Sequence, residues 1–199
     1  TPFEKGKKTP SNFCPRGSGN SYGDISLQTN IIDCTGNRET LELENDILTA
    51  SAGYTIADIL NFCIPKGYIL PVIPGTQHPT VGGMIAADVH GKNHVTHGAI
   101  GKWIESMEIQ NQQGEITVCS PTENTELFEM TIGGLGLTGI IISAKFKLIP
   151  LKTTAFEQRT TKFPSLNAML SALDESTAEH KTCWFDFLRM DSFLLLENN

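Results

Sequence analysis

The sequence predicts an α+β fold with one complete domain and the beginning of another. Short β-branched segments alternate with segments of helical periodicity, and no internal repeat is visible. The chain has 199 residues, which is enough to bury a core without disulfide bonds. Its 18 glycines end at Gly139, and the last sixty residues contain none. We therefore expect a glycine-rich domain over residues 1–150 and the incomplete start of a second α+β domain over residues 151–199.

The first domain is expected to mix short strands with short helices. β-branched runs bounded by turn residues predict strands at 30–35, 47–52, 68–73, 103–110, 115–120 and 140–149, with a hairpin turn at Gln113-Gly114. Thr55 can cap a helix whose apolar residues share one face, and Gly67 can end it. Two further helices are predicted at 80–88 and 127–132, and the first of them opens at glycines that let backbone N–H groups approach a ligand.

The composition changes after Pro150, which follows the strongest predicted strand of the chain. Ser165 begins a predicted helix over residues 165–175, because apolar residues recur there at helical spacing. A strand is predicted from Trp184 to Phe187. The chain starts at Thr1 and stops in what reads as a strand over 194–199, so we expect a fragment of a longer protein.

Charge and cysteine usage exclude several classes of protein. The chain has 15 Lys and Arg residues against 22 Asp and Glu residues, and its net charge of −7 argues against reliance on the overall field to hold nucleic acid or an anionic membrane. The five cysteines are odd in number, widely spaced and without a CxxC pair, which favours reduced thiols in a cytoplasmic protein. No apolar run approaches the ~18 residues of a transmembrane helix, so none is expected.

The first of three glycine-rich segments is the run RGSGNSYGD over residues 16–24. Successive small residues can turn their backbone N–H groups inward as an anion-binding nest, and Ser18 and Ser21 add hydroxyl donors. Arg16 is the local cation, so the backbone would supply most of the donors to a group such as a pyrophosphate. An ordinary surface loop is the alternative interpretation.

The third segment, from Gly134 to Gly139, formally matches the pattern GxGxxG. A Rossmann dinucleotide site needs that pattern to follow a strand and open a helix, whereas here it follows a helical segment and opens a strand. Arg159 stands where the acidic residue of such a site would be expected. Gly91-Lys92 and Gly101-Lys102 lack the rest of a P-loop, so neither nucleotide motif is expected.

The middle segment joins PGTQHPTVGG, residues 74–83, to HGKNH, residues 90–94. His90, His94 and His97 have a spacing that could bind zinc on one helical face, but Gly91 follows His90 and no carboxylate lies within the set. Hydrogen bonding within a loop is the ordinary role for His78 and His97. We therefore expect no metal site.

Taken together and in this order, four segments carry a family resemblance: RGSGNSYGD, PGTQHPTVGG, HGKNH and GGLGLTGII. They resemble the FAD-binding domain of the vanillyl-alcohol oxidase and p-cresol methylhydroxylase (PCMH) superfamily, and within it the decaprenylphosphoryl-β-D-ribose 2′-oxidase group. The resemblance covers about residues 12–150 and continues weakly to 184–186. It implies a two-subdomain FAD-binding domain of the PCMH type, followed by a substrate (cap) domain.

The resemblance also assigns roles to the residues that match the family's motifs. The first loop would wrap the FAD pyrophosphate, and it comprises Arg16, Gly17, Ser18, Gly19, Asn20, Ser21, Tyr22, Gly23 and Asp24. Contacts to the phosphates and flavin are implied for Gly75, Thr76, Thr80, Val81, Gly82 and Gly83, and contacts along the isoalloxazine for Ala87, Asp88, Val89 and His90. The main chain of Gly139, Ile140 and Ile141 would receive the cofactor, and Lys92 would point toward the substrate side.

The chemistry that the resemblance implies is the oxidation of a secondary alcohol of a sugar with FAD as cofactor. A hydride passes from the CH–OH carbon to flavin N5 while a protein base takes the hydroxyl proton, and His90 and Lys92 are the nearest titratable candidates for catalysis. Many relatives carry a histidine bound covalently to the flavin where Asn20 stands here. Non-covalent FAD is therefore expected.

The substrate and partners are less closely defined. An aldonolactone or alditol oxidase of the same superfamily would share the cofactor but not the substrate, and a flavin-binding fragment without turnover is a further alternative. The resemblance implies a sugar or a polyprenyl-phosphate-linked sugar as substrate and a partner reductase, without nucleic acid. A lipid-linked substrate would place the cytoplasmic protein peripherally at a membrane.

Overall fold

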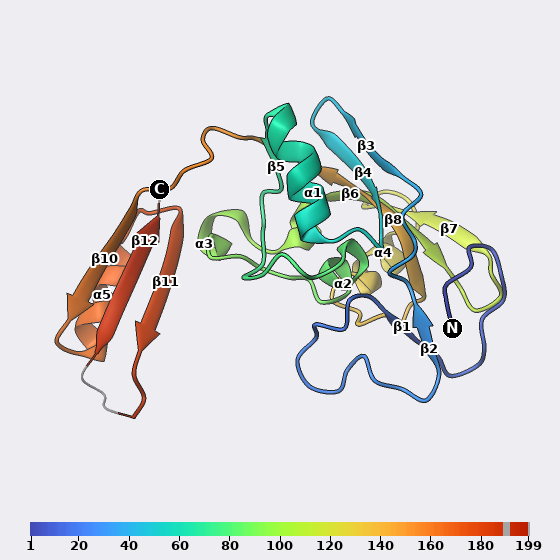
Figure 1. Ribbon diagram of the computed structural model, residues 1–199, viewed down its shortest axis with the longest axis horizontal. Coiled ribbons are helices and arrows are strands. Elements are labelled where there is room, and N and C mark those ends of the chain that lie inside the picture. The colour runs from blue at the N-terminus through green and yellow to red at the C-terminus, as the bar shows by residue number, and fades with distance from the viewer. Residues whose placement is uncertain (189–191, 199) are drawn as a thin grey trace.

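The computed structural model describes residues 1–188 and 192–198. They form a larger unit up to Pro150 and a smaller unit from Gln158 onward, each with its own sheet. An extended segment joins the two units, as Figure 1 shows. The smaller unit contains no glycine, so the compositional change in the sequence coincides with the change from one sheet to the other.

An antiparallel sheet of five strands forms the centre of the larger unit. Its strands, in spatial order, are β3 (Leu41–Glu44), β4 (Ile47–Ser51), β8 (Ile140–Lys147), β6 (Ile104–Gln110) and β7 (Ile116–Cys119). The first three residues of β8 are all buried and the later ones alternate between buried and exposed. The start of this central strand is therefore covered on both faces, whereas its end is covered on one.

Short helices accompany this sheet, and the first two of them begin at a side-chain cap. They are α1 (Ile56–Cys63), α2 (Val81–Ala86), α3 (His94–His97) and α4 (Thr125–Thr131), with 3₁₀ turns at Ile64–Lys66 and Ile100–Trp103. Thr55 and Asp58 form a capping box at α1, where the Asp58 carboxylate accepts from the Thr55 N–H at 2.8 Å. The Thr80 hydroxyl accepts from the Gly83 N–H at 3.2 Å and so begins α2.

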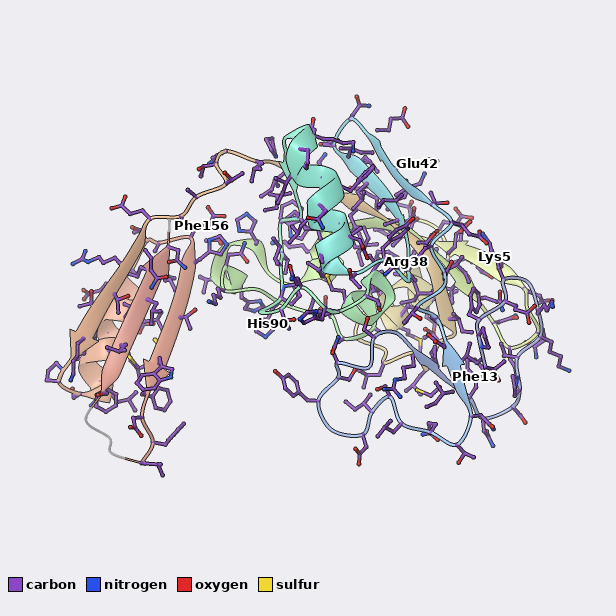
Figure 2. All side chains as sticks on the ribbon, viewed as in Figure 1. Lys5, Phe13, Arg38, Glu42, His90 and Phe156 are labelled. Atoms are coloured by element: carbon purple, nitrogen blue, oxygen red, sulfur yellow. The ribbon has the colours of Figure 1, made fainter. Side chains whose placement is uncertain are left out.

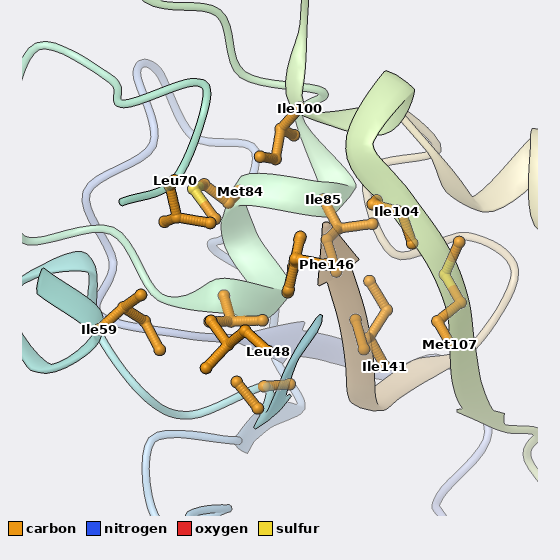
Figure 3. Packing of buried hydrophobic residues seen from close by; sticks show 14 of the residues in the cluster. Leu48, Ile59, Leu70, Met84, Ile85, Ile100, Ile104, Met107, Ile141 and Phe146 are labelled. Atoms are coloured by element: carbon orange, nitrogen blue, oxygen red, sulfur yellow. The ribbon is translucent and has the colours of Figure 1, made fainter. Parts of the chain in front are cut away.

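The main hydrophobic core lies between the sheet and the first two helices. Figure 3 shows Leu48 and Phe146 from the sheet near Ile59 from α1 and Met84 and Ile85 from α2. All five side chains are completely buried. Burial of a side chain of this size stabilises the fold by about 1.5–3 kcal/mol. This core therefore fixes α2 rigidly against the sheet, which matters because α2 borders the candidate site.

Two short ladders flank the central sheet. β1 (Cys14–Arg16) and β2 (Ile31–Asp33) pair in parallel, and residues 17–30 between them form the long excursion at the lower edge of Figure 1. β5 (Tyr68–Ile69) and β9 (Ile149–Pro150) pair in antiparallel fashion. The first glycine-rich segment thus leaves β1 as a loop.

The smaller unit is a three-stranded antiparallel sheet with one helix. Its elements are β10 (Gln158–Phe163), α5 (Leu166–Glu175), β11 (His180–Phe185) and β12 (Phe193–Asn198), and β12 is the middle strand. Met169 of α5 packs with Phe193 and Leu195 of β12 in a second core. Within the described residues, no helix has both the length and the apolar character needed to cross a membrane.

The structure differs from the sequence prediction at several strands. The strand predicted over 68–73 ends at Ile69, because Pro71 and Pro74 cannot donate hydrogen bonds to a ladder. β11 ends at Phe185, earlier than the predicted strand, because the Asp186 carboxylate accepts from the Leu188 N–H in a turn. The strand expected at 194–199 falls in β12, except that Asn199 lies outside the described residues. The other predicted strands and all four predicted helices are confirmed with shifted ends, whereas β1, β3 and β10 were not predicted.

Candidate functional site

A cavity of about 520 Å³ lies where the β1–β2 loop, α2 and the start of β8 meet, and we call it the first cavity. Its volume is within the range of ordinary cofactor sites. Seventeen of the predicted cofactor-binding residues line it: Arg16, Gly17, Ser18, Gly19, Asn20, Ser21, Tyr22, Gly75, Thr76, Thr80, Gly82, Gly83, Ala87, Val89, Gly139, Ile140 and Ile141. Segments that are far apart in the sequence therefore border one cavity.

Close backbone contacts bring the glycine-rich segments together around this cavity. A Cβ atom on Gly17 would overlap the hydroxyl of Thr80, so the first loop packs directly on the cap of α2. A Cβ atom on Gly136 would lie 2.8 Å from Cγ of Pro15, so the third segment packs on β1. Side chains at either glycine would push these segments apart, which explains why glycine occurs at both.

The wall of the first cavity is rich in hydrogen-bond donors but poor in charge. Among the described residues, no backbone N–H from residue 17 to residue 26 donates to another protein group. Arg16 is the one charged side chain in the lining that the structure describes. An anion bound here would therefore be held mainly by backbone N–H groups and one guanidinium, as the sequence predicted for the first loop.

Two thiols also border the first cavity. Cys14 is the first residue of β1, and Cys34 directly follows β2. Both thiols are free. Burial raises the pKa of the Cys34 thiol to about 11, and burial also raises the pKa of Cys14, against the opposing effect of Arg16. Both sulfurs are therefore neutral near pH 7, and the cavity gains no anionic nucleophile from them.

A second cavity of about 650 Å³ adjoins the first, and Gly75 belongs to the lining of both. Its other lining residues come from the segment after Val89 and from the smaller unit: His90, Gly91, Lys92, His94, Val95, Leu173, Asp174, Lys181, Thr182 and Cys183. The rings of His90 and His94 meet edge to face with their centroids 5.3 Å apart. The two candidate catalytic residues, His90 and Lys92, thus lie on the second cavity.

The loop that carries these basic residues is fixed by Asn93. This side chain is 4% exposed, and its amide donates to the carbonyl of Pro71 at 2.8 Å. The Asn93 carbonyl accepts from the backbone N–H groups of Thr96 and His97. With Asn93 anchored inside, its neighbours Lys92 and His94 remain exposed at the second cavity. Figure 2 shows His90 below α3, on the side of the larger unit that faces the smaller one.

Five predicted cofactor contacts do not line the first cavity. Gly23 and Asp24 lie outside the lining at the far end of the first loop, and His90 lies on the second cavity. Val81 is completely buried in the core, and its N–H donates to the carbonyl of Tyr54. Asp88 has φ of 42° and accepts from the Gly101 N–H at 2.9 Å, so it shapes the chain before His90. Val81 and Asp88 therefore support the cavity wall.

The zinc alternative has no geometric support. In residues 1–188 and 192–198, no three His, Cys, Asp or Glu side chains come together as a metal-binding group. His97 turns away from His90 and His94, because its ring stacks on Trp103 at 5.8 Å and its Nε2 lies 3.9 Å from a carboxylate oxygen of Glu179. His97 therefore helps to join the larger unit to the smaller one.

Comparison with known proteins identifies the family. The model of a family described as FAD binding domain matches residues 6–120, which is more than half of the chain. The chain belongs to the FAD binding domain family. This domain holds FAD as its cofactor, and the matched residues include the first three of the four sequence motifs, so the resemblance to an FAD-binding domain is confirmed.

Three curated relatives of this FAD binding domain protein are named as oxidases of a sugar derivative or a sugar lactone. It is 35% identical to decaprenylphosphoryl-beta-D-ribose oxidase of Mycolicibacterium smegmatis, over 86% of this chain and 39% of that protein. It is 30% identical to D-arabinono-1,4-lactone oxidase of Debaryomyces hansenii, over 66% of this chain and 24% of that protein. Identity to L-gulonolactone oxidase of Bos taurus is 26%, over 86% of this chain and 38% of that protein. The chain thus spans less than two fifths of the length of each of these relatives.

The residues around the first cavity fit FAD. The free backbone N–H groups of the first loop suit a pyrophosphate, and the exposed backbone of Gly83 on α2 provides a surface against which a flat ring can pack. Apolar lining by Ala86, Val89 and Ile141 suits an aromatic ring system. The donor set and the shape of the FAD binding domain therefore agree with its family.

Sequence reasoning missed several residues around the two cavities. Leu135 and Gly136 line the first cavity, although they belong to the GGLGLTGII segment that carried the resemblance. Asn93 was quoted only as part of HGKNH, and its burial next to exposed Lys92 could not be read from the sequence. Lys181 reaches the second cavity from β11, and no motif in the sequence marks it.

Proposed function

We propose that this chain is the cofactor-binding part, with the beginning of the substrate domain, of an FAD-dependent oxidoreductase that oxidises a secondary alcohol of a sugar. The observation that carries this proposal is the junction of the two cavities at Gly75. One cavity is rich in backbone donors and carries a single charged side chain, Arg16, which suits FAD, and the other presents two histidines and two lysines beside it. The names of three relatives, which are oxidases of a decaprenylphosphoryl ribose or of a sugar lactone, support the same reaction class.

In the proposed mechanism, the first cavity binds the cofactor and the second cavity binds the substrate. Bound FAD supplies the hydride acceptor, at flavin N5. The first cavity orients the cofactor and shields it from water, through the residues that line it from the first loop to Ile141. His90, on the second cavity next to the junction, takes the proton of the substrate hydroxyl as a general base. Lys92 orients the substrate and offers a positive charge at the same cavity.

Replacement of His90 by alanine tests its assignment as the base. Loss of a general base lowers rates by about 100-fold or more, so anaerobic reduction of the flavin by substrate should slow by that factor. His90 is exposed, so the thermal midpoint should stay within about 2 °C of wild type. His78→Ala is the matched control, since His78 is exposed and lines neither cavity. An unchanged reduction rate in His90→Ala would remove His90 from the mechanism.

We also propose that the chain holds FAD without a covalent bond. The side chain at position 20 on the first cavity is an asparagine. Its amide nitrogen is too weak a nucleophile to form the covalent bond to flavin that an imidazole nitrogen forms. Acid denaturation followed by centrifugation should therefore release essentially all the flavin into the supernatant. Flavin that co-migrates with the denatured polypeptide in a gel would contradict this prediction.

The overall function is tested by anaerobic reduction of the FAD-loaded protein, in its full natural length, with a panel of sugars, sugar phosphates and aldonolactones. Bleaching of the flavin by one class identifies the substrate class. Preference for a lactone or an alditol would favour the second candidate, which the lactone oxidases among the relatives support. A yellow protein that no member of the panel reduces would favour a flavin-binding module without turnover.

Several finer features belong to the same proposal. We place a FAD-binding domain of the two-subdomain PCMH type at residues 1–150, and the start of the substrate domain at 151–199, which includes residues outside those described. The separate sheets of the two units support this division. Five free cysteines suit a reducing cytoplasm, and a polyprenyl-linked substrate would bring the protein to the membrane surface. The partner reductase that the family resemblance implies belongs to the same proposal.

A further inference from the structure

Residues 90–94 are held from the inside while their basic side chains line the second cavity. The two histidines and the lysine of this segment are exposed, whereas Asn93 is 4% exposed. Gly91 packs on the backbone of Ile73, because a Cβ atom on it would lie 2.7 Å from the Ile73 carbonyl oxygen. A side chain at position 91 would push the segment away from this support. Gly91 and Asn93 therefore anchor the three basic residues.

Asn93 does not use its side chain in the way that its position predicts. It is the N-cap residue of α3, and an asparagine there usually accepts a hydrogen bond from an N–H in the first turn of the helix. Within the part of the chain that the structure describes, α3 has no such side-chain cap. The Asn93 amide instead donates to the carbonyl of Pro71 at 2.8 Å, and Pro71 is itself buried. The side chain thus binds the segment before Gly75 and leaves α3 uncapped.

This hydrogen bond joins the basic segment to the junction of the two cavities. Pro71 lies four residues before Gly75, which lines both cavities. Val72, between them, is completely buried in the main core, so the segment that receives the Asn93 amide is firmly placed. The Asn93 amide therefore fixes the basic segment relative to the junction.

Two contacts connect Asn93 to the ring of His90. A Cβ atom on Gly91 would lie 2.8 Å from Oδ1 of Asn93, so the Asn93 side chain packs on the residue next to His90. His94 directly follows Asn93, and its ring meets that of His90 edge to face with the centroids 5.3 Å apart. His90 in turn follows Val89, which lines the first cavity. A displacement of Asn93 would therefore displace the His90 ring beside that cavity.

We propose that Asn93 is a positioning residue, which holds the His90 imidazole at the junction of the cavities, beside the bound flavin. The proposal rests on the proposed function, in which His90 is the general base. Asn93 lines neither cavity, so it acts only through its neighbours. A misplacement of about 1 Å can lower the rate of a reaction about 100-fold, and a buried amide with one fixed partner restricts such movement.

A merely structural role for Asn93 makes a different prediction. If the amide only satisfied a buried carbonyl, Asn93→Ala would lower the thermal midpoint and leave the folded, FAD-loaded protein otherwise unchanged. If it positions His90, Asn93→Ala should resemble His90→Ala, and its effect should disappear when residue 90 is already alanine. Asn93→Leu lacks the donor but fills about the same space, so it keeps the test usable if the alanine variant does not fold.

The first measurement is the visible circular dichroism of the bound flavin in the FAD-loaded protein of full natural length, which needs no sugar. This signal reports how groups are arranged around the isoalloxazine ring. Asn93→Ala should change it in the same direction as His90→Ala, and the double variant should match His90→Ala. Asn37→Ala is the matched control, because Asn37 is 6% exposed, donates to the Ile142 carbonyl at 2.8 Å and lines neither cavity. The control should lose stability and keep the wild-type signal.

The second measurement is the rate of anaerobic flavin reduction by the sugar that the panel identifies. Asn93→Ala should slow this step by about 10- to 100-fold, because the base is present but misplaced. In the His90→Ala background the same replacement should change the rate by no more than about 2-fold, since no imidazole remains to be positioned. Asn37→Ala should reduce at the wild-type rate.

The outcomes separate this proposal from the proposed function. A folded Asn93→Ala protein with the wild-type dichroism, or with the wild-type rate where a sugar reduces the wild type, overturns the positioning role and leaves the oxidase assignment standing. Equal effects of Asn93→Ala with and without the His90 imidazole also overturn it. A dichroism change that requires His90, in a protein that no sugar reduces, upholds the placement of His90 by Asn93 and overturns the oxidase assignment.

Discussion

Replacement of Gly83 by valine is expected to abolish retention of FAD while leaving the fold intact. Gly83 lies on α2 in the wall of the first cavity, and its backbone is exposed there. A Cβ atom at this position would have one protein neighbour within 4 Å, the hydroxyl of Thr80 at 3.3 Å. The valine side chain would therefore extend into the space that the cofactor needs. A steric cost of about 3 kcal/mol lowers affinity by about 100-fold.

The ratio of flavin to protein absorbance after gel filtration measures this loss, and a thermal melt measures the fold. Gly36→Val is the matched control, because a Cβ atom there meets nothing within 4 Å and Gly36 lines neither cavity. Gly82→Val is expected to lose FAD and stability together, since its Cβ would lie 3.1 Å from Cβ of Ala52. A Gly83→Val protein with normal flavin content would show that FAD does not lie against α2.

The parts of the fold that could be predicted from the sequence are those that local chemistry decides. Thr55 and Ser165 each accept from an N–H three residues later, so the starts of α1 and α5 follow from the residue type at one position. The β1 strand could not be predicted in the same way. Its three residues are partly buried, include Pro15, and form a strand only because β2 returns to pair with them after a loop of fourteen residues, 17–30.

In the candidate site, too, the features that local sequence decides could be predicted, and those that long-range contacts decide could not. The glycines and hydroxyl residues of the sequence indicated the first cavity. Each segment that lines it has glycines of its own, where the backbone offers N–H donors or lies close to another segment. Val81 was assigned to the ligand with its neighbours, yet its side chain faces the core, since in so short a helix one face must pack against the sheet. The lining of the second cavity depends on the backbone hydrogen bond from the Lys181 N–H to the Lys92 carbonyl, which joins the two units. No local sequence pattern marks a contact between residues so far apart in the chain.

Phe146→Ala is expected to cause the largest loss of stability in the larger unit, about 3–5 kcal/mol. Phe146 is completely buried on β8, opposite Leu48 of β4 and Ile104 of β6. Its removal leaves a cavity between the central strand and the helices that border the FAD site, and the packed neighbours can relax only in part. The free energy of unfolding in urea, measured with and without added FAD, tests this expectation.

Because Phe146 lines neither cavity, the intrinsic affinity for FAD should remain close to that of wild type in the folded fraction. FAD at 100 times its Kd should then restore about 2.7 kcal/mol of stability to Phe146→Ala, as it would to wild type, because binding favours the folded state. Phe146→Leu fills more of the space and should cost about 1–2 kcal/mol, which keeps the test usable if the alanine variant does not fold. A loss below about 1 kcal/mol in Phe146→Ala would mean that β8 is not the strand on which this core depends. A large loss of FAD affinity in folded Phe146→Leu would instead mean that packing behind α2 sets the shape of the first cavity.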